Sequence, residues 1–147
     1  MSGPIEDIRA DLDTHFFGTL SVIRAFAPRI AANGGGAILN VLSAASWIGK
    51  ESGGAYAAAK TVEWSLTNSV RLELISRNIR VVGLHVGFMA TDLASRVDAP
   101  KADPAAIAKI TLDGLAADLY EIVADERSRQ IQQALSGGVP ALYPQLP

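Results

Sequence analysis

The sequence predicts an α/β protein with a partial parallel sheet of about three strands and flanking helices. Segments with apolar residues at helical spacing alternate with short, nearly continuous apolar runs, which are typical of parallel strands covered on both faces. The order helix, strand, helix, strand, helix, strand favours right-handed parallel crossovers. The 147 residues suit one domain, with 136–147 as a C-terminal tail.

The first predicted element is a long amphipathic helix from Pro4 to about Asn33, where apolar residues recur at steps of three and four. Pro4 suits the first turn of this helix. Pro28 lies inside the pattern, so we expect it to kink or end the regular helix nearby. The run NGGG at 33–36 then terminates the helix.

The elements that follow alternate strand and helix. We expect strands at 37–42, 79–86 and 119–124, and helices at 55–77, 104–118 and 125–135. The tail is rich in glycine and proline, and we expect it to lie as coil on the surface. A sheet of this order leaves the apolar first strand without a neighbour, which is a liability.

The composition argues against several classes of function. The chain is 49% hydrophobic and 19% charged, as globular proteins are, and its net charge of −2 argues weakly against nucleic acid or anionic membrane as the main partner. With no cysteine, His15 and His85 cannot form a cysteine–histidine metal site, and we predict no metal. The acidic N-terminus is unlike a signal peptide and no apolar run is long enough to span a bilayer, so we expect a soluble, cytoplasmic protein.

Three polar residues have a spacing that favours acid–base chemistry. Ser43 follows the first predicted strand, Tyr56 begins the next helix, and Lys60 follows one turn later on the same face. An ammonium close to a phenol lowers its pKa from about 10, so that the tyrosine can exchange a proton with a carbonyl or alcohol oxygen. Each residue alone is more often structural: a half-buried tyrosine, a solvated lysine, a serine at a strand end. Their combination favours the chemical interpretation.

The segment GGGAILNVLSAASWIGKESGGAYAAAK resembles the short-chain dehydrogenase/reductase family from its glycine turn through its active-site helix. RLELISRNIRVVGLHVGFMATDL and FFGTLSVIRAFAPRI resemble neighbouring parts of that family, so the resemblance runs from about Ile5 to Asp125. It implies a Rossmann-like sheet and an NAD(P)-dependent oxidoreductase that acts on a small-molecule carbonyl or alcohol.

The resemblance also implies roles for individual residues. Tyr56 would be the general acid/base, Lys60 would tune it and bind the cofactor ribose, and Ser43 would polarise the substrate oxygen. In the loop after the second strand, the residues implied at the nicotinamide end of the cofactor are Gly87, Met89 and Thr91.

The chain departs from the family in three places. No glycine-rich turn for the cofactor pyrophosphate follows a strand, so we expect a truncated domain that lacks roughly 90 residues, or three βαβ units, and binds NAD(P) weakly if at all. His15 aligns with the family's active-site asparagine. It either takes over the task of holding a water next to the lysine or is a plain structural histidine. Val86 aligns with a proline of the cofactor loop.

A second hypothesis is a catalytically inactive fragment that serves as an oligomerisation or interaction module. In the family, the helices that correspond to 4–32 and 55–77 commonly form a four-helix interface, so we predict a homodimer or higher oligomer built on them. We expect His85 and Trp64 to be packed in the core or at a contact. Trp47 is expected there too, although it follows Ser43 closely enough to line a substrate pocket.

Overall fold

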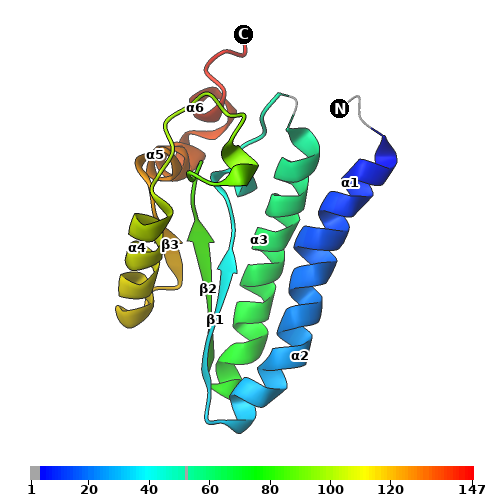
Figure 1. The fold of residues 1–147 in the computed structure, drawn as a ribbon, viewed down its shortest axis with the longest axis vertical. Helices are drawn as coiled ribbons and strands as arrows, with labels where there is room; N and C mark the ends of the chain where they lie inside the picture. The colour runs from blue at the N-terminus through cyan, green and yellow to red at the C-terminus, as the bar shows by residue number, and fades with distance from the viewer. Residues whose placement is uncertain (1–3, 52) are drawn as a thin grey trace.

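The computed structural model describes residues 4–51 and 53–147, which form a layered α/β unit (Figure 1). Three parallel strands lie in the order β1-β2-β3. The strands are β1 (Gly36–Val41), β2 (Ile79–His85) and β3 (Glu121–Val123). The helices are α1 (Ile5–Leu12), α2 (Thr19–Ala32), α3 (Gly54–Leu74), α4 (Pro104–Ala116), α5 (Glu126–Ala134) and α6 (Gly138–Leu142). The predicted α/β class and its Rossmann-like parallel sheet of three strands are confirmed.

The first predicted helix is a continuous rod in which the π-helical segment η1 (Asp13–Gly18) joins α1 to α2. Pro28 lies inside α2, which continues to Ala32, so of the two expected effects, a kink or an end of the helix nearby, the proline itself does not end the helix. The proline is exposed, and water can therefore satisfy the carbonyl that loses its partner. The buried side chains Ile23 and Ala27 hold the same helix against the core.

The run NGGG ends the rod as predicted, and Gly35 shows why glycine is needed there. Its φ is 102°, and a Cβ at this position would lie 2.2 Å from the carbonyl oxygen of Asn78. The turn therefore brings two backbones closer than any side chain allows, and it feeds the chain directly into β1.

The sheet has a core on each face. On one face α2 and α3 pack against the sheet, and α4 covers the other (Figure 1). Val81 and Val82 are consecutive, fully buried residues of β2 that belong to the two different cores, as the alternation along a strand requires. This double coverage explains why β2 reads as a continuous apolar run.

The C-terminal tail is not coil as predicted. It contains a 3-10 turn at 135–137 followed by α6, and Pro140 lies in the first turn of α6, where its missing N–H costs little. The amide of Gly49 donates to the Tyr143 hydroxyl at 2.7 Å. The tail is thus attached to the loop that follows β1.

Backbone pairing continues beyond the strands and fixes the start of that loop. Leu42 donates to the carbonyl of Leu84 at 2.8 Å, and Ala44 donates to that of Val86 at 3.0 Å. Ser43, between these two bonds, is therefore held at the carboxyl end of the sheet, where open α/β folds bind ligands.

Candidate active site

A cavity of about 420 Å³ opens at the carboxyl ends of β1 and β2. The structure brings to its wall every residue that the sequence singled out for the site: His15, Ser43, Tyr56, Lys60, Gly87, Met89 and Thr91. These residues come from η1, from α3 and from the loops after β1 and β2. Segments far apart in the sequence thus converge on one place.

Ser43 combines a structural and a chemical position. It is the N-cap of the 3-10 turn η2 (Ala44–Ser46), and its Oγ accepts from the amide of Ala45 at 3.1 Å. Because a serine hydroxyl is also a donor, its proton remains available to an oxygen in the cavity. Capping the turn therefore orients the hydroxyl without using its donor.

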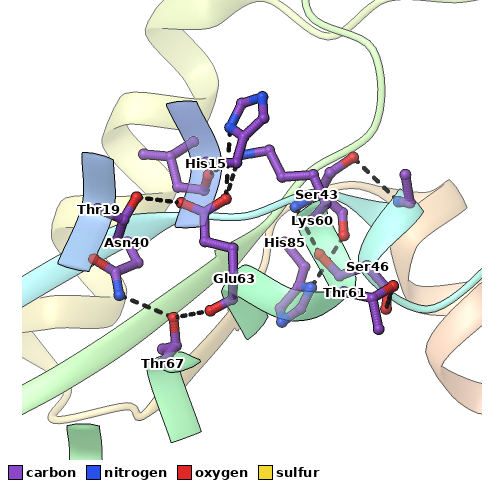
Figure 2. A network of polar contacts seen from close by, with 12 residues as sticks. His15, Thr19, Asn40, Ser43, Ser46, Lys60, Thr61, Glu63, Thr67 and His85 are labelled. Atoms are coloured by element: carbon purple, nitrogen blue, oxygen red, sulfur yellow. Dashed lines mark hydrogen bonds and ion pairs between the residues drawn. The ribbon is translucent and has the colours of Figure 1, made fainter. Parts of the chain in front are cut away.

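Tyr56 and Lys60 lie one turn apart near the start of α3. Lys60 is only 6% exposed, so the structural interpretation of a solvated lysine does not hold. Its ammonium donates to the carbonyl of Val41 at 2.9 Å and to Oε2 of Glu63 at 2.7 Å (Figure 2). The Glu63 carboxylate is buried, and the Val41 residue lines the cavity wall at the end of β1.

Glu63 is the residue at this site that the sequence reasoning missed. It is 4% exposed, its Oε1 accepts from the Thr19 hydroxyl at 2.9 Å, and its Oε2 lies 3.8 Å from Nδ1 of His15. The available signal was its position three residues after Lys60, which places the two side chains on one helix face. Figure 2 shows the carboxylate between lysine, threonine and histidine.

The network continues from Glu63 into the sheet. The Thr67 hydroxyl donates to the backbone carbonyl of Glu63 at 2.8 Å and accepts from Nδ2 of Asn40 at 2.9 Å (Figure 2). Asn40 belongs to β1 and is itself buried. We call the side chains of Thr19, Asn40, Lys60, Glu63 and Thr67 the Lys60 network.

The pKa of Tyr56 is raised above its usual value of 10.0, chiefly because the side chain is partly buried. The neighbouring Ser43 hydroxyl lowers this pKa, whereas the carboxylates of Glu63 and Asp11 raise it further. The expectation that Lys60 brings this pKa down is not met in the chain itself, where burial is the largest cause and raises the pKa. The lysine ammonium donates to the carboxylate of Glu63.

His15 occupies the position discussed in the sequence, and its pKa lies below the usual 6.5. Burial is the largest cause, followed by the Lys60 charge, while Glu63 and Asp11 act in the opposite direction. Its ring meets that of Tyr56 edge to face, with centroids 5.4 Å apart. His15 is therefore a neutral group at neutral pH, in contact with the tyrosine and near the carboxylate.

The second histidine belongs to the core, as predicted. His85 is fully buried and stacks on Trp47 with centroids 3.7 Å apart, and Trp64 meets it edge-on. Its Nδ1 lies 3.3 Å from the carbonyl oxygen of Ser43. Trp47 is buried and is not among the described residues that line the cavity, so it supports the site from behind.

The loop after β2 is fixed to the following element. The amide of Gly87 donates to Oδ2 of Asp125 at 2.5 Å, and Oδ1 of Asp125 accepts from the amide of Ser128 and so caps α5. A Cβ at Gly87 would lie 3.3 Å from Oδ1 of Asp125. The loop that carries Met89 and Thr91 therefore approaches the N-terminus of α5 closely.

The residues present fit one end of a nicotinamide dinucleotide. The Lys60 ammonium has three protons, and the structure uses two of them, so one remains for a ligand hydroxyl. Tyr56 and the loop from Gly87 to Thr91 line the same cavity. Nowhere in the sequence does a glycine-rich turn for a pyrophosphate follow a strand.

Within residues 4–51 and 53–147, no helix combines the length and the apolar character needed to cross a bilayer.

Comparison with known proteins gives one consistent result. The short chain dehydrogenase family matches residues 3–102. An uncharacterized oxidoreductase of Mycobacterium tuberculosis is 30% identical over 112 residues, which cover 76% of this chain and 45% of that protein. A cyclohexanol dehydrogenase of an Acinetobacter species is 33% identical over 94 residues, 64% of this chain and 38% of that protein. The chain thus spans about half the length, or less, of the curated relatives it matches.

A solved structure has the same arrangement of elements. The crystal structure of a short chain dehydrogenase from Burkholderia cenocepacia in complex with NADP superposes with a TM-score of 0.84 at 29% identity. The match covers 97% of this chain and 60% of that one. Nearly all of the present fold therefore has a counterpart in a protein that binds a nicotinamide cofactor.

Proposed function

The chain belongs to the short-chain dehydrogenase family, and from that premise we propose that it carries the proton-transferring and nicotinamide-facing part of an NAD(P)-dependent oxidoreductase. The substrate class is a carbonyl compound or the corresponding alcohol. The observation that carries the proposal is the convergence of Ser43, Tyr56 and Lys60 on one cavity at the strand ends. The NADP-bound relative supports the choice of cofactor.

The side chains divide the work as follows. A nicotinamide group bound in the cavity would supply or accept the hydride at the substrate carbon. In the reducing direction the Tyr56 phenol donates its proton to the carbonyl oxygen, which becomes the alcohol, and the tyrosine is reprotonated from solvent. The Ser43 hydroxyl donates a hydrogen bond to the same oxygen and polarises it.

Lys60 has a positional role in this scheme. Its carbonyl and carboxylate partners hold the ammonium against α3 and β1, and its remaining proton can bind a ribose hydroxyl of the cofactor. Thr91 and the backbone around Gly87 and Met89 are the proposed contacts of the nicotinamide end. His15 completes the wall on the side of α1.

The chemistry of the cavity walls indicates which kind of substrate body fits the site. Besides the polar site residues and the cations Lys50 and Arg127, the walls are largely apolar, with the side chains of Ile48, Phe88, Leu93, Val97 and Ile131. A carbonyl group attached to an apolar body therefore fits best, with its oxygen toward Ser43 and Tyr56.

Cofactor affinity provides the test on the chain as it stands. The residues present contact the nicotinamide end only, and losing about 4 kcal/mol of binding weakens a micromolar site to roughly millimolar. We expect NADPH to bind at millimolar concentration at best. Saturation-transfer NMR should show stronger transfer to the nicotinamide protons than to the adenine protons. Micromolar binding, or transfer centred on the adenine, would contradict the proposal.

A second candidate function is that of an interaction module, and one surface favours it. Within the described residues β1 pairs with β2 alone, and a groove of about 390 Å³ follows its other edge. We call this surface the β1 groove; the residues that define it here are Val22, Phe26, Ile38 and Val41. An apolar strand edge of this kind favours association with another polypeptide, either a completing segment or a further copy of the chain.

A further inference from the structure

The contact of Lys60 with Glu63 is a buried ion pair on α3, the helix that also carries the proposed catalytic tyrosine. Both side chains are more than nine-tenths buried, and their charged atoms are 2.7 Å apart. A buried charge pair is stabilising only where its geometry is good and its remaining polar atoms are satisfied. Such a pair beside a proton-transferring group also changes the charge that this group experiences.

The carboxylate of Glu63 is fixed from two elements. Oε1 accepts from Thr19 on α2, and Oε2 accepts from Lys60 on α3. The backbone carbonyl of Glu63 is in turn held by Thr67, which binds Asn40 on β1. The carboxylate therefore cannot leave the lysine without breaking bonds to the surrounding layers (Figure 2).

The lysine is correspondingly directed into the interior. Its ammonium donates to Glu63 and to the Val41 carbonyl, and among the described residues no hydrogen bond joins it to the Tyr56 hydroxyl. The positive charge that would favour a phenolate is thus matched by a negative one at hydrogen-bonding distance.

We propose that Glu63 is a positioning residue that binds the Lys60 ammonium from below, neutralises its charge and keeps Tyr56 a protonated phenol, so that the site is set to donate a proton. This inference rests on the proposed function, because it assigns a working direction to the same tyrosine. A phenol that stays protonated at neutral pH suits reduction of a carbonyl, in which the tyrosine must deliver its proton to oxygen.

The charged groups around Tyr56 agree with this assignment. They are Asp11 on α1, His15 on η1, and Lys60 and Glu63 on α3. Lys50 and Arg127 line the same cavity, where their cations lie over the Phe88 ring. Two carboxylates thus face one lysine and one histidine that is neutral at neutral pH. The raised pKa of Tyr56 has burial as its main cause and both carboxylates as further causes.

The experiment is a pH titration of the tyrosines in the bare chain, with no cofactor or substrate. NMR of ring-labelled tyrosine resolves Tyr56, Tyr120 and Tyr143, and Tyr56→Phe assigns the signal. In Glu63→Gln we expect the Tyr56 midpoint to move to lower pH, because a negative charge is lost and the lysine charge is unmasked. Glu63→Asp, which keeps the carboxylate, should restore most of the wild-type midpoint.

Glu73→Gln is the matched control, since Glu73 is an exposed carboxylate of the same helix α3. It should leave the Tyr56 midpoint unchanged. A Tyr56 midpoint in folded Glu63→Gln that equals those of wild type and Glu73→Gln would overturn the inference.

Two further measurements test the inference if the Glu63→Gln variant does not fold, or if it unfolds at the alkaline pH that the tyrosine titration needs. The Tyr56 midpoint in Lys60→Met/Glu63→Gln should lie below that in Lys60→Met, and equal midpoints would overturn the inference. At acid pH the His15 midpoint should fall in the variants that lack the Glu63 charge and not in Glu73→Gln; an unmoved His15 would likewise contradict it. Since no reading needs turnover, an inactive chain would affect only the proposed function.

Discussion

The Lys60 network and the β1 groove adjoin, because Thr19, Asn40 and Glu63 of the network also line the groove, but the polar and the apolar side chains differ in how they are covered. In the network every buried side-chain donor or acceptor has a partner within the described residues. In the groove Val22, Phe26 and Val41 are 59%, 53% and 48% exposed. The polar side chains of the first region have their partners within the described residues, whereas the second region presents apolar surface that residues 4–51 and 53–147 leave uncovered.

This difference separates what the chain can do alone from what it needs a partner for. Orientation of Lys60 and protonation of Tyr56 depend on contacts already present. Under the proposed function, tight cofactor binding and coverage of the sheet edge would come from polypeptide that packs against β1. We therefore expect substitutions in the network to act on Tyr56 and Lys60, and substitutions in the groove to act on association.

Breaking the Lys60 network should have the largest effect on stability. Lys60→Met leaves the Glu63 carboxylate buried without its partner, which costs about 3–5 kcal/mol of unfolding free energy. Urea unfolding should show that Lys60→Met/Glu63→Met loses much less, because a buried pair can be replaced by apolar side chains at little cost. If the single and the double variant lost the same unfolding free energy, Lys60 and Glu63 would not be energetically coupled.

The control for that experiment is an ion pair outside the network. The charged atoms of Lys109 and Asp113 on α4 are 2.6 Å apart, close to the 2.7 Å of the Lys60–Glu63 pair, but both side chains are largely exposed. Lys109→Met should change the unfolding free energy little, since exposed pairs contribute little. If Lys109→Met lowered the unfolding free energy as much as Lys60→Met does, the loss would come from removing any lysine and not from breaking a buried ion pair.

A substitution in the β1 groove should change the unfolding free energy little and self-association strongly. Phe26→Asp introduces a charge where the side chain is already half exposed, so the unfolding free energy should change by no more than about 0.5 kcal/mol. Self-association, which we predict for helices 4–32 and 55–77, should weaken about tenfold or more, equivalent to about 1.4 kcal/mol. Sedimentation equilibrium measures this, with Leu112→Asp on the exposed side of α4 as control. Unchanged association in Phe26→Asp would remove this part of α2 from the interface.

The smallest expected effect is a pH dependence that comes from His15, whose Nδ1 lies 3.8 Å from Oε2 of Glu63. The fold holds the pKa of His15 below 6.5, so the unfolded chain binds the proton more tightly. The contribution of His15 is therefore fully present above about pH 6.5 and is lost as the pH falls through the folded-state pKa, by at most about 1.4 kcal/mol per pH unit. Unfolding free energies between about pH 7 and 5 should decline less in His15→Gln. An equal decline would assign the dependence to other groups.

The sequence predicted those features that depend on local pattern. The three strands and the helices that cover them follow from periodicity and glycine placement, and the spacing from Ser43 to Lys60 follows from strand and helix geometry. The helix does not end at Pro28 and the tail is not coil, because packing of Ile23 and Ala27, and the Tyr143 contact with Gly49, outweigh local propensity. Glu63 was missed because a glutamate on a long helix normally faces water. Only the position of Thr19 and Lys60 in the folded chain explains its burial.

The central claim is that Tyr56 is the proton donor of an oxidoreductase site that needs a cofactor-binding complement. The most direct measurement is NADPH oxidation by this chain fused behind the glycine-rich N-terminal part, about 90 residues, of the NADP-binding relative from Burkholderia cenocepacia, with a ketone of apolar body as substrate. The account predicts turnover by the fusion protein and a loss of at least about a hundredfold in Tyr56→Phe, the usual contribution of a positioned general acid. A fusion protein whose turnover survives Tyr56→Phe would contradict it.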